Sequence, residues 1–209
     1  MEPFITHSGR TICLYEDNVD TDQILPKQFM KRIESTGYGD CLFFERRRGE
    51  DGTPDPNFIL NQPGCLTASI LVTGENFGCG SARQHAVWAL RDFGFKVLIG
   101  PSFSGTFYVN CFNFAILPAI VHPEELVLLL NLSTETSLVL TIDLPSQTIR
   151  LENGIQLDFE VPSYFKNALV TGMNQIDITM EYADVIARFE SCQQKRLPWI
   201  WTPNPGRCV

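Results

Sequence analysis

The chain has 209 residues, a formal net charge of −8, 44% hydrophobic and 19% charged residues. This length allows a sizeable core, and the ordinary composition predicts one globular domain over residues 1–209. The acidic balance argues against nucleic acid, and the polar first residues and short apolar runs predict neither a signal peptide nor a membrane span. We therefore expect a cytoplasmic protein with no nucleic-acid or membrane partner.

The first part of the chain predicts a strand over residues 11–15, an acidic turn over residues 17–22 and a loop to Phe44. The turn does not fit an EF-hand, because counting from Asp17 or Asp20 gives neither the required glycine nor the required glutamate. An Asx-rich turn is the structural alternative. The basic triplet 46–48 and the Pro/Gly-rich stretch after it predict a solvated surface excursion.

The middle of the chain alternates between apolar β-rich runs and amphipathic runs. It predicts strands at 68–72, 96–99 and 115–118 and helices at 82–93, 105–110 and 123–132, with Gly94 capping the first helix. Strands joined by helical crossovers predict a parallel βαβαβ arrangement. Later runs at 138–144, 148–151 and 155–161 predict antiparallel hairpins, followed by helices at 163–171 and 180–194 and an irregular tail from about residue 196.

The most informative segment is GENFGCGSARQH, residues 74–85, between the strand at 68–72 and the helix that follows. Its glycines permit positive φ and close approach of a ligand, and a helix start offers unpaired N–H groups to a carboxylate or phosphate. Ser81 and Arg83 are expected on that first turn. Arg83 stands where a dinucleotide fingerprint needs its third glycine, and no lysine lies between Gly74 and Lys96 for a P-loop.

An arginine beside a serine at a helix start favours a small carboxylate substrate, because guanidinium matches carboxylate geometry. The structural alternatives are an ordinary helix N-cap for Ser81 and a surface salt bridge for Arg83.

The seven cysteines are an odd number without CxxC spacing, so we expect reduced thiols. Cys79 and Cys111 flank the glycine segment and a neighbouring motif, which raises the hypothesis of a metal or cluster site. The absence of cluster-binding spacing favours buried thiols instead, and the three histidines are too dispersed for a zinc site. We expect no metal on this chain.

The run G-x-N-F-G-x-G-S-x-R-x-H resembles the signature of the aconitase superfamily's swivelling domain, most closely in the family of 3-isopropylmalate dehydratase small subunits. Residues 17–29, 88–103 and 110–118 extend the resemblance. It implies an α/β fold, a swivelling β/β/α domain of the aconitase type, with a mixed sheet whose middle is parallel and whose later hairpins are antiparallel.

The same resemblance implies a hydro-lyase that isomerises 2-isopropylmalate and 3-isopropylmalate in leucine biosynthesis by dehydration and rehydration. Ser81 would be the base and Arg83 would bind a substrate carboxylate, with Gly80 and Ala82 beside them at the substrate. Asp22, in the segment resembling T-D-x-I, would be an active-site carboxylate that accepts hydrogen bonds.

The loop after Asp22 would contact the variable group of the substrate through Ile24, Leu25 and Pro26. An apolar loop suits a branched alkyl group, whose burial contributes roughly 2 kcal/mol.

The chain alone offers too little charge stabilisation for this reaction. A helix terminus contributes at most about 2 kcal/mol, which shifts a serine by only about one pKa unit. An external positive centre is therefore required. In the family it is an iron–sulfur cluster on the large subunit, so the resemblance implies a small hydroxy-dicarboxylate substrate, no cofactor on this chain, and a cluster-bearing partner in a heterodimer or larger assembly.

Two positions depart from the family pattern: Ala82 replaces a second serine, and Gln84 replaces a glutamate before His85. They leave open a catalytically silent module that retains the fold. Arg32 leaves open a substrate with an additional carboxylate, such as homoaconitate. The alternative enzyme is a homoaconitate or methylmalate-type dehydratase small subunit. We expect His85 to be a buried residue with a structural hydrogen bond.

Overall fold

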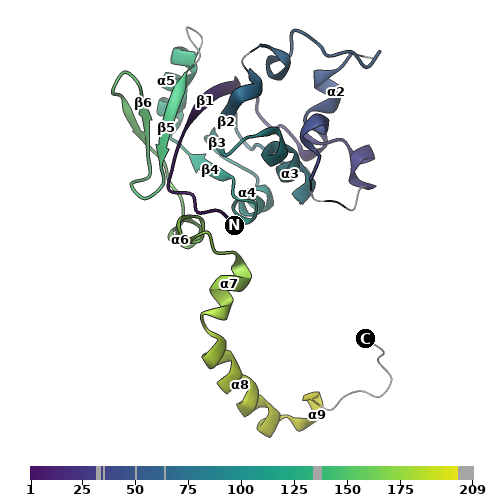
Figure 1. Cartoon of the computed structure of the whole chain (residues 1–209), viewed down its shortest axis with the longest axis vertical. Coiled ribbons are helices and arrows are strands. Elements are labelled where there is room, and N and C mark those ends of the chain that lie inside the picture. Colours follow the sequence, from purple (N-terminus) through teal and green to yellow (C-terminus); the bar gives the residue numbers. More distant parts are fainter. Residues whose placement is uncertain (32–33, 35, 50, 64, 134–137, 202–209) are drawn as a thin grey trace. The chain divides into compact units, whose positions relative to one another are not determined.

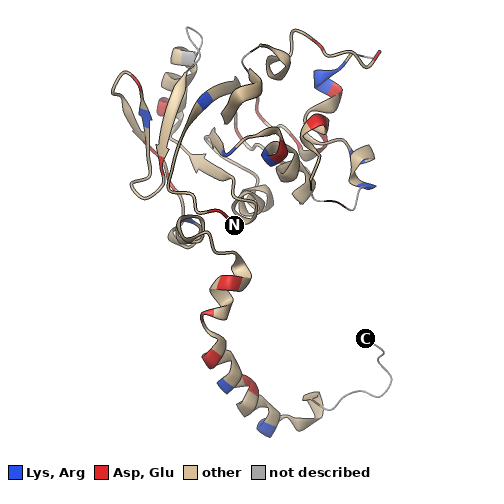
Figure 2. Ribbon diagram, in the orientation of Figure 1, with Lys and Arg blue, Asp and Glu red and all other residues tan. Residues whose placement is uncertain are grey.

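The computed structural model describes residues 1–31, 34, 36–49, 51–63, 65–133 and 138–201. Contacts divide the chain into two compact units, Met1–Gly172 and Met173–Val209. In the described part of the chain, no helix combines the length and the apolar character needed to cross a membrane. Figure 2 shows the basic residues dispersed along the ribbon among acidic ones, and the exclusion of nucleic acid as a partner stays a prediction.

The first unit is built on a seven-stranded mixed sheet in the order β4-β3-β2-β1-β5-β6-β7 (Figure 1). The strands are β1 (Thr6–Leu14), β2 (Ala68–Thr73), β3 (Val97–Gly100), β4 (Leu117–Ile120), β5 (Val139–Asp143), β6 (Thr148–Leu151) and β7 (Gln156–Asp158). From β4 to β1 the neighbours are parallel, and from β1 to β7 they are antiparallel. The predicted mixed sheet is thereby confirmed.

Alternation along the strands assigns side chains to two cores, one on each face of the sheet. In β2, Leu71 belongs to one buried cluster, whereas Ile70 and Val72 belong to the other. Every residue of β3 is buried, as expected for a parallel strand covered on both faces. Pro118 lies in β4, an edge strand, where a missing N–H is tolerated.

The longer helices of the first unit are α3 (Gln84–Phe93), α4 (Gly105–Asn113), α5 (Pro123–Ser133) and α6 (Ser163–Thr171). Gly94 ends α3 in the left-handed region at φ 118°, and its N–H donates to the carbonyls of Leu90 and Arg91. The predicted cap is therefore confirmed. The predicted start of this helix at residue 82 is wrong, because α3 begins two residues later, at Gln84.

The segment expected to be a turn and loop up to Phe44 is more ordered than its sequence indicates. It contains the short helix α1 (Thr21–Ile24) and 3₁₀ turns at Lys27–Lys31 and Gly39–Cys41, and it leads into α2 (Phe44–Arg47). Asp20 caps α1, accepting from the Gln23 N–H at 2.8 Å. Three apolar side chains fix the segment by burial in the core; they are Tyr38, Leu42 and Phe43.

The basic triplet is not a solvated loop. The guanidinium carbons of Arg46, Arg47 and Arg48 lie 5.0–5.1 Å from the ring centroids of Phe58, Phe93 and Phe44, respectively. Guanidinium groups stack favourably on aromatic faces, which explains the half-buried positions. Burial also lowers the pKa of Arg47 from its ordinary value.

The second unit consists of α7 (Gln175–Met180), α8 (Ala183–Arg196) and α9 (Pro198–Trp201), where the sequence predicts one helix over 180–194. The predicted irregular tail is wrong for α9, and residues 202–209 lie outside the described residues. No described residue of these three helices is buried. A unit without a core does not qualify as a second domain, so the expectation of one domain over 1–209 stays a prediction.

Candidate active site

Two loops that are far apart in the sequence lie side by side beyond the ends of β1 and β2. The Thr21 N–H donates to the Cys79 carbonyl at 2.9 Å, and the Gly78 N–H donates to the Val19 carbonyl at 2.8 Å. Asp20 and Cys79 form a parallel bridge. Because β1 and β2 are parallel neighbours, their carboxyl ends meet at the same edge of the sheet, where α/β folds bind ligands. The acidic turn and the glycine segment therefore form one site.

Glycine is required at two positions for this approach. A Cβ at Gly74 would collide with the carbonyl of Glu16 in the facing loop. Gly78 has φ 76°, and a Cβ there would collide with the ring of Phe107. The glycine motif thus reflects close packing of this segment against the facing loop at Gly74 and against α4 at Gly78.

Ser81 lies before α3 rather than on its first turn. Its N–H donates to Oγ1 of Thr21 at 3.3 Å, and its Oγ lies 3.2 Å from the same atom. The helix N-cap is Arg83, whose side chain forms no capping bond. The N-cap alternative for Ser81 is therefore wrong, because contact with the facing loop holds this backbone outside the helix.

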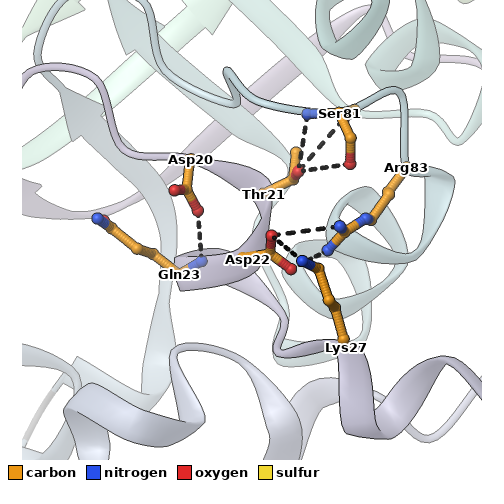
Figure 3. A network of polar contacts seen from close by, with 7 residues as sticks. All are labelled: Asp20, Thr21, Asp22, Gln23, Lys27, Ser81 and Arg83. Atoms are coloured by element: carbon orange, nitrogen blue, oxygen red, sulfur yellow. Dashed lines mark hydrogen bonds and ion pairs between the residues drawn. The ribbon is translucent and has the colours of Figure 1, made fainter.

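Arg83 and Asp22 form a two-point ion pair at this corner (Figure 3). Nη1 of Arg83 donates to Oδ1 of Asp22, and Nη2 donates to Oδ2 at 3.2 Å. The ammonium of Lys27 lies 3.4 Å from Oδ2. The hydrogen bond from Arg83 is the main reason why the pKa of Asp22 is lowered from its ordinary value, and Lys27 adds to the effect. The salt-bridge alternative for Arg83 thus holds in this structure.

Beside this network lies a pocket of about 360 Å³. Its lining is predominantly polar and of mixed charge: Asp20, Asp22, Gln23, Pro26, Lys27, Gln28 and Glu45. Asp22 and Lys27 belong both to the pocket and to the ion-pair network, so a ligand in the pocket would meet the charges that surround Arg83.

The apolar residues after Asp22 divide between the core and the pocket. Ile24 is 0% exposed and Leu25 is 1% exposed, and both pack in the hydrophobic core. The prediction that Ile24 and Leu25 contact the substrate is therefore corrected, because α1 turns their side chains inward. Pro26 is also buried, although part of its ring lines the pocket. Arg32 lies outside the described residues.

The remaining predicted site residues flank Ser81. Gly80 adopts φ 92°, and both Gly80 and Ala82 are exposed. Sequence reasoning left Thr21, Gln28 and Glu45 without a role. The segment T-D-x-I contains Thr21, but only the contact with Ser81 reveals the part that this threonine plays.

His85 is half-buried and contacts two aromatic rings, with centroids 5.7 Å from Tyr38 and 4.6 Å from Trp88. Burial, and to a lesser extent the charge of Arg83, lower its pKa from the ordinary value. The lowered pKa favours the neutral imidazole at pH 7. The expected burial of His85 is only partial, and its structural hydrogen bond stays a prediction.

Among the described residues, the cysteine thiols do not form a set of metal ligands. Cys111 is buried, which raises its pKa well above the ordinary value, and Cys79 Sγ lies 3.3 Å from the Asn18 carbonyl. Throughout the described ranges, no three His, Cys, Asp or Glu side chains lie close enough together to hold a metal ion. These donors do not fit a metal or an iron–sulfur cluster.

Comparisons with known proteins identify the family of this chain. Residues 1–124 match the aconitase C-terminal domain. The 3-isopropylmalate dehydratase small subunit of Halalkalibacterium halodurans is 47% identical to this chain. The alignment covers 91% of this chain and 98% of that subunit. The corresponding small subunit of Bacillus subtilis is 46% identical over 96% of this chain and 99% of its own.

A crystal structure of 3-isopropylmalate dehydratase from Methanocaldococcus jannaschii superposes with a TM-score of 0.62 at 24% identity. It covers 88% of this chain and 99% of its own. This likeness supports the aconitase-type fold, while the relatives at higher identity establish the family. The chain belongs to the family of 3-isopropylmalate dehydratase small subunits and contains an aconitase C-terminal domain.

Proposed function

We propose that this chain is the small subunit of a 3-isopropylmalate dehydratase, a hydro-lyase that interconverts 2-isopropylmalate and 3-isopropylmalate in leucine biosynthesis. The observation that carries the proposal is the meeting of Ser81, Arg83 and Asp22 at one sheet edge. A relative at 47% identity is a 3-isopropylmalate dehydratase small subunit. This favours the proposed function over that of a homoaconitate or methylmalate-type dehydratase and over a catalytically silent module.

Each residue of the site has a distinct task in this proposal. Ser81 is the base that takes the substrate proton, and its exposed position makes it accessible. Arg83 binds a substrate carboxylate, since a guanidinium offers more N–H donors than the two that Asp22 occupies. Asp22 stays ionised and orients Arg83. Gly80 and Ala82 bring the backbone close to the substrate.

The pocket beside Asp22 would receive the variable group of the substrate. Pro26 supplies an apolar surface there, and Gln28 lies on the same lining. Lys27 offers a second positive charge near the substrate carboxylates. The burial of Ile24 and Leu25 limits the apolar surface that this loop presents. The residues that line the pocket therefore determine which substrate is accepted.

The site is incomplete without a second subunit. The dipole of α3 and one arginine provide too little positive charge to ionise a serine at neutral pH, because a helix terminus contributes at most about 2 kcal/mol. We therefore place an iron–sulfur cluster on a large subunit, where it would act as the Lewis acid for the substrate hydroxyl. The assembly is a heterodimer or larger, acts on a small hydroxy-dicarboxylate, and works in the cytoplasm.

Reconstitution tests this proposal. The chain alone should be colourless and inactive, and adding a cluster-loaded large subunit should produce turnover of 3-isopropylmalate. Ser81→Ala should abolish turnover and leave assembly intact. Ser104→Ala is the matched control, because Ser104 also precedes a helix without a side-chain capping bond, and it should retain full activity. A tightly held cluster in the lone chain, or normal turnover by Ser81→Ala, would contradict the proposal.

A further inference from the structure

We propose that Thr21 is a positioning residue for Ser81, and that its hydroxyl stabilises Ser81 when that side chain is ionised. The inference rests on the proposed function, because it takes Ser81 to be the base. Thr21 does not line the pocket beside Asp22, and it lies at the start of α1, 60 residues away from Ser81 in sequence. Its hydroxyl nevertheless lies within hydrogen-bond distance of three atoms of Ser81 (Figure 3).

Thr21 is held firmly enough to act in this way. It is 1% exposed, one of few polar residues buried in the described chain. Its N–H donates to the Cys79 carbonyl at 2.9 Å, and its carbonyl accepts from the Leu25 N–H at 3.0 Å. Asp20 caps the same short helix. The backbone of Thr21 is thus fixed on both sides, and the hydroxyl has a defined place beside Ser81.

The hydrogen bonds of this hydroxyl leave its proton available. Oγ1 of Thr21 accepts from the Ser81 N–H at 3.3 Å. Its single proton has two acceptors at 3.2 Å, the carbonyl oxygen and Oγ of Ser81. The carbonyl already accepts from the Arg83 N–H at 2.8 Å. The carbonyl therefore does not need the Thr21 proton, and the proton can turn to Oγ of Ser81.

The acceptor that receives the Thr21 proton matters when Ser81 loses its own proton. In the neutral state Ser81 can donate to Thr21, whose proton points to the carbonyl. Once Oγ is negative, the Thr21 proton rotates toward it and forms a charge-assisted hydrogen bond, which is stronger than the neutral one it replaces. Thr21 thereby stabilises the ionised form more than the neutral form. It also holds the backbone of Ser81 outside α3 through the hydrogen bond from the Ser81 N–H.

The prediction for the assembled enzyme is a loss in kcat with little change in KM. Thr21→Val keeps the shape and removes the hydroxyl, and it should lower kcat about ten- to a hundredfold while KM stays within about threefold, because Thr21 does not contact the substrate. Thr21→Ser keeps the hydroxyl and should restore kcat to within about threefold of wild type. Thr148→Val is the matched control, since Thr148 is also a buried threonine but lies in β6; it should keep wild-type kcat.

The outcomes separate this inference from the proposed function. Full activity of Thr21→Val, or an equal loss in Thr21→Ser, overturns the role of Thr21 and leaves the proposed function standing. An inactive wild-type assembly overturns both. If Thr21→Val does not assemble with the large subunit, Thr21→Cys replaces it. Its thiol is a weaker donor than a hydroxyl, so kcat should fall clearly below that of Thr21→Ser, and wild-type kcat in Thr21→Cys overturns the inference.

Discussion

The guanidinium of Arg83 is bound at two points by the carboxylate of Asp22, although Asp22 lies in α1 after β1 and Arg83 precedes α3 after β2. Arg83 has a side chain that is only 15% exposed, whereas that of Asp22 is 42% exposed. The arginine is therefore fixed in the wall of the site and the carboxylate faces the opening. This pairing sets the orientation of the group that we expect to bind substrate.

Asp22→Asn should raise KM for 3-isopropylmalate and lower kcat/KM about ten- to a hundredfold. The amide cannot form the same charge-assisted pair, so Arg83 loses the orientation that a two-point contact provides. Steady-state kinetics of the assembled enzyme measure the effect. A lower KM in the variant would mean that Asp22 competes with the substrate for Arg83 instead of orienting it.

The stability that the same pair provides should depend on pH at the acidic end. The pKa of Asp22 is lowered in the folded chain, so its stabilisation is fully present above the unfolded pKa of about 3.9 and is lost as pH falls through the folded value. The difference in Tm between wild type and Asp22→Asn should be constant from pH 7 to about pH 5 and shrink below about pH 4. A difference that disappears by pH 6 would contradict this prediction.

Arg83→Lys should weaken substrate binding more than it affects the fold. Lysine keeps the charge but cannot contact two carboxylate oxygens in parallel, whether of Asp22 or of the substrate. We expect KM to rise about tenfold or more, with a change in the free energy of unfolding of about 1 kcal/mol or less. Kinetics and chemical denaturation check the two parts. Unchanged KM would show that another group binds the carboxylate.

Specificity should respond to Gln28 and not to Leu25. Gln28 is exposed and lines the pocket, so Gln28→Arg should leave folding intact and favour a substrate with an additional carboxylate relative to 3-isopropylmalate. Leu25 is buried in the core, so Leu25→Arg should destabilise the chain by several kcal/mol. Relative kcat/KM values over a substrate panel and unfolding curves distinguish these effects. An unchanged substrate ranking in Gln28→Arg would place the determinant elsewhere.

Local sequence predicts the strands and helices of the sheet region well, because apolar runs and their periodicity depend on burial alone. It does not predict that β1 pairs with β2 on one side and with β5 on the other. A strand's periodicity says which face is buried and nothing about its neighbours. The same limit applies to the segment before Phe44, where Tyr38 and Leu42 are ordered by contacts distant in sequence.

In the candidate site, too, some residues can be found from the sequence and others cannot. Ser81 and Arg83 stand out in the glycine segment as candidates for a carboxylate site, whereas the place of Asp22 is implied only by the resemblance of its segment to T-D-x-I. The orientation of Ile24 and Leu25 cannot be predicted from the sequence, because an apolar residue beside a site has the same local pattern whether it faces a ligand or the core. Thr21 is also hidden, because its role depends on a contact between two loops.

Ala82 provides the sharpest test of substrate binding beside Ser81. It is exposed and precedes the N-cap Arg83, so a serine hydroxyl at residue 82 would not replace the helix cap, and the free energy of unfolding should change by about 0.5 kcal/mol or less. A hydrogen bond to a neutral group contributes about 0.5–1.5 kcal/mol, and one to a charged group about 1.5–3 kcal/mol. If a substrate carboxylate binds here, Ala82→Ser should raise kcat/KM roughly threefold to a hundredfold.

Kinetics of the assembled enzyme, with unfolding curves of both forms, decide between the outcomes for Ala82→Ser. A gain in kcat/KM without a gain in stability assigns the new hydroxyl to the substrate, because a contact within the chain would stabilise the free subunit as well. An active enzyme that is indifferent to the change has another donor for that carboxylate. If both forms are inactive with a competent large subunit, the chain is a silent module and the enzymatic proposal fails.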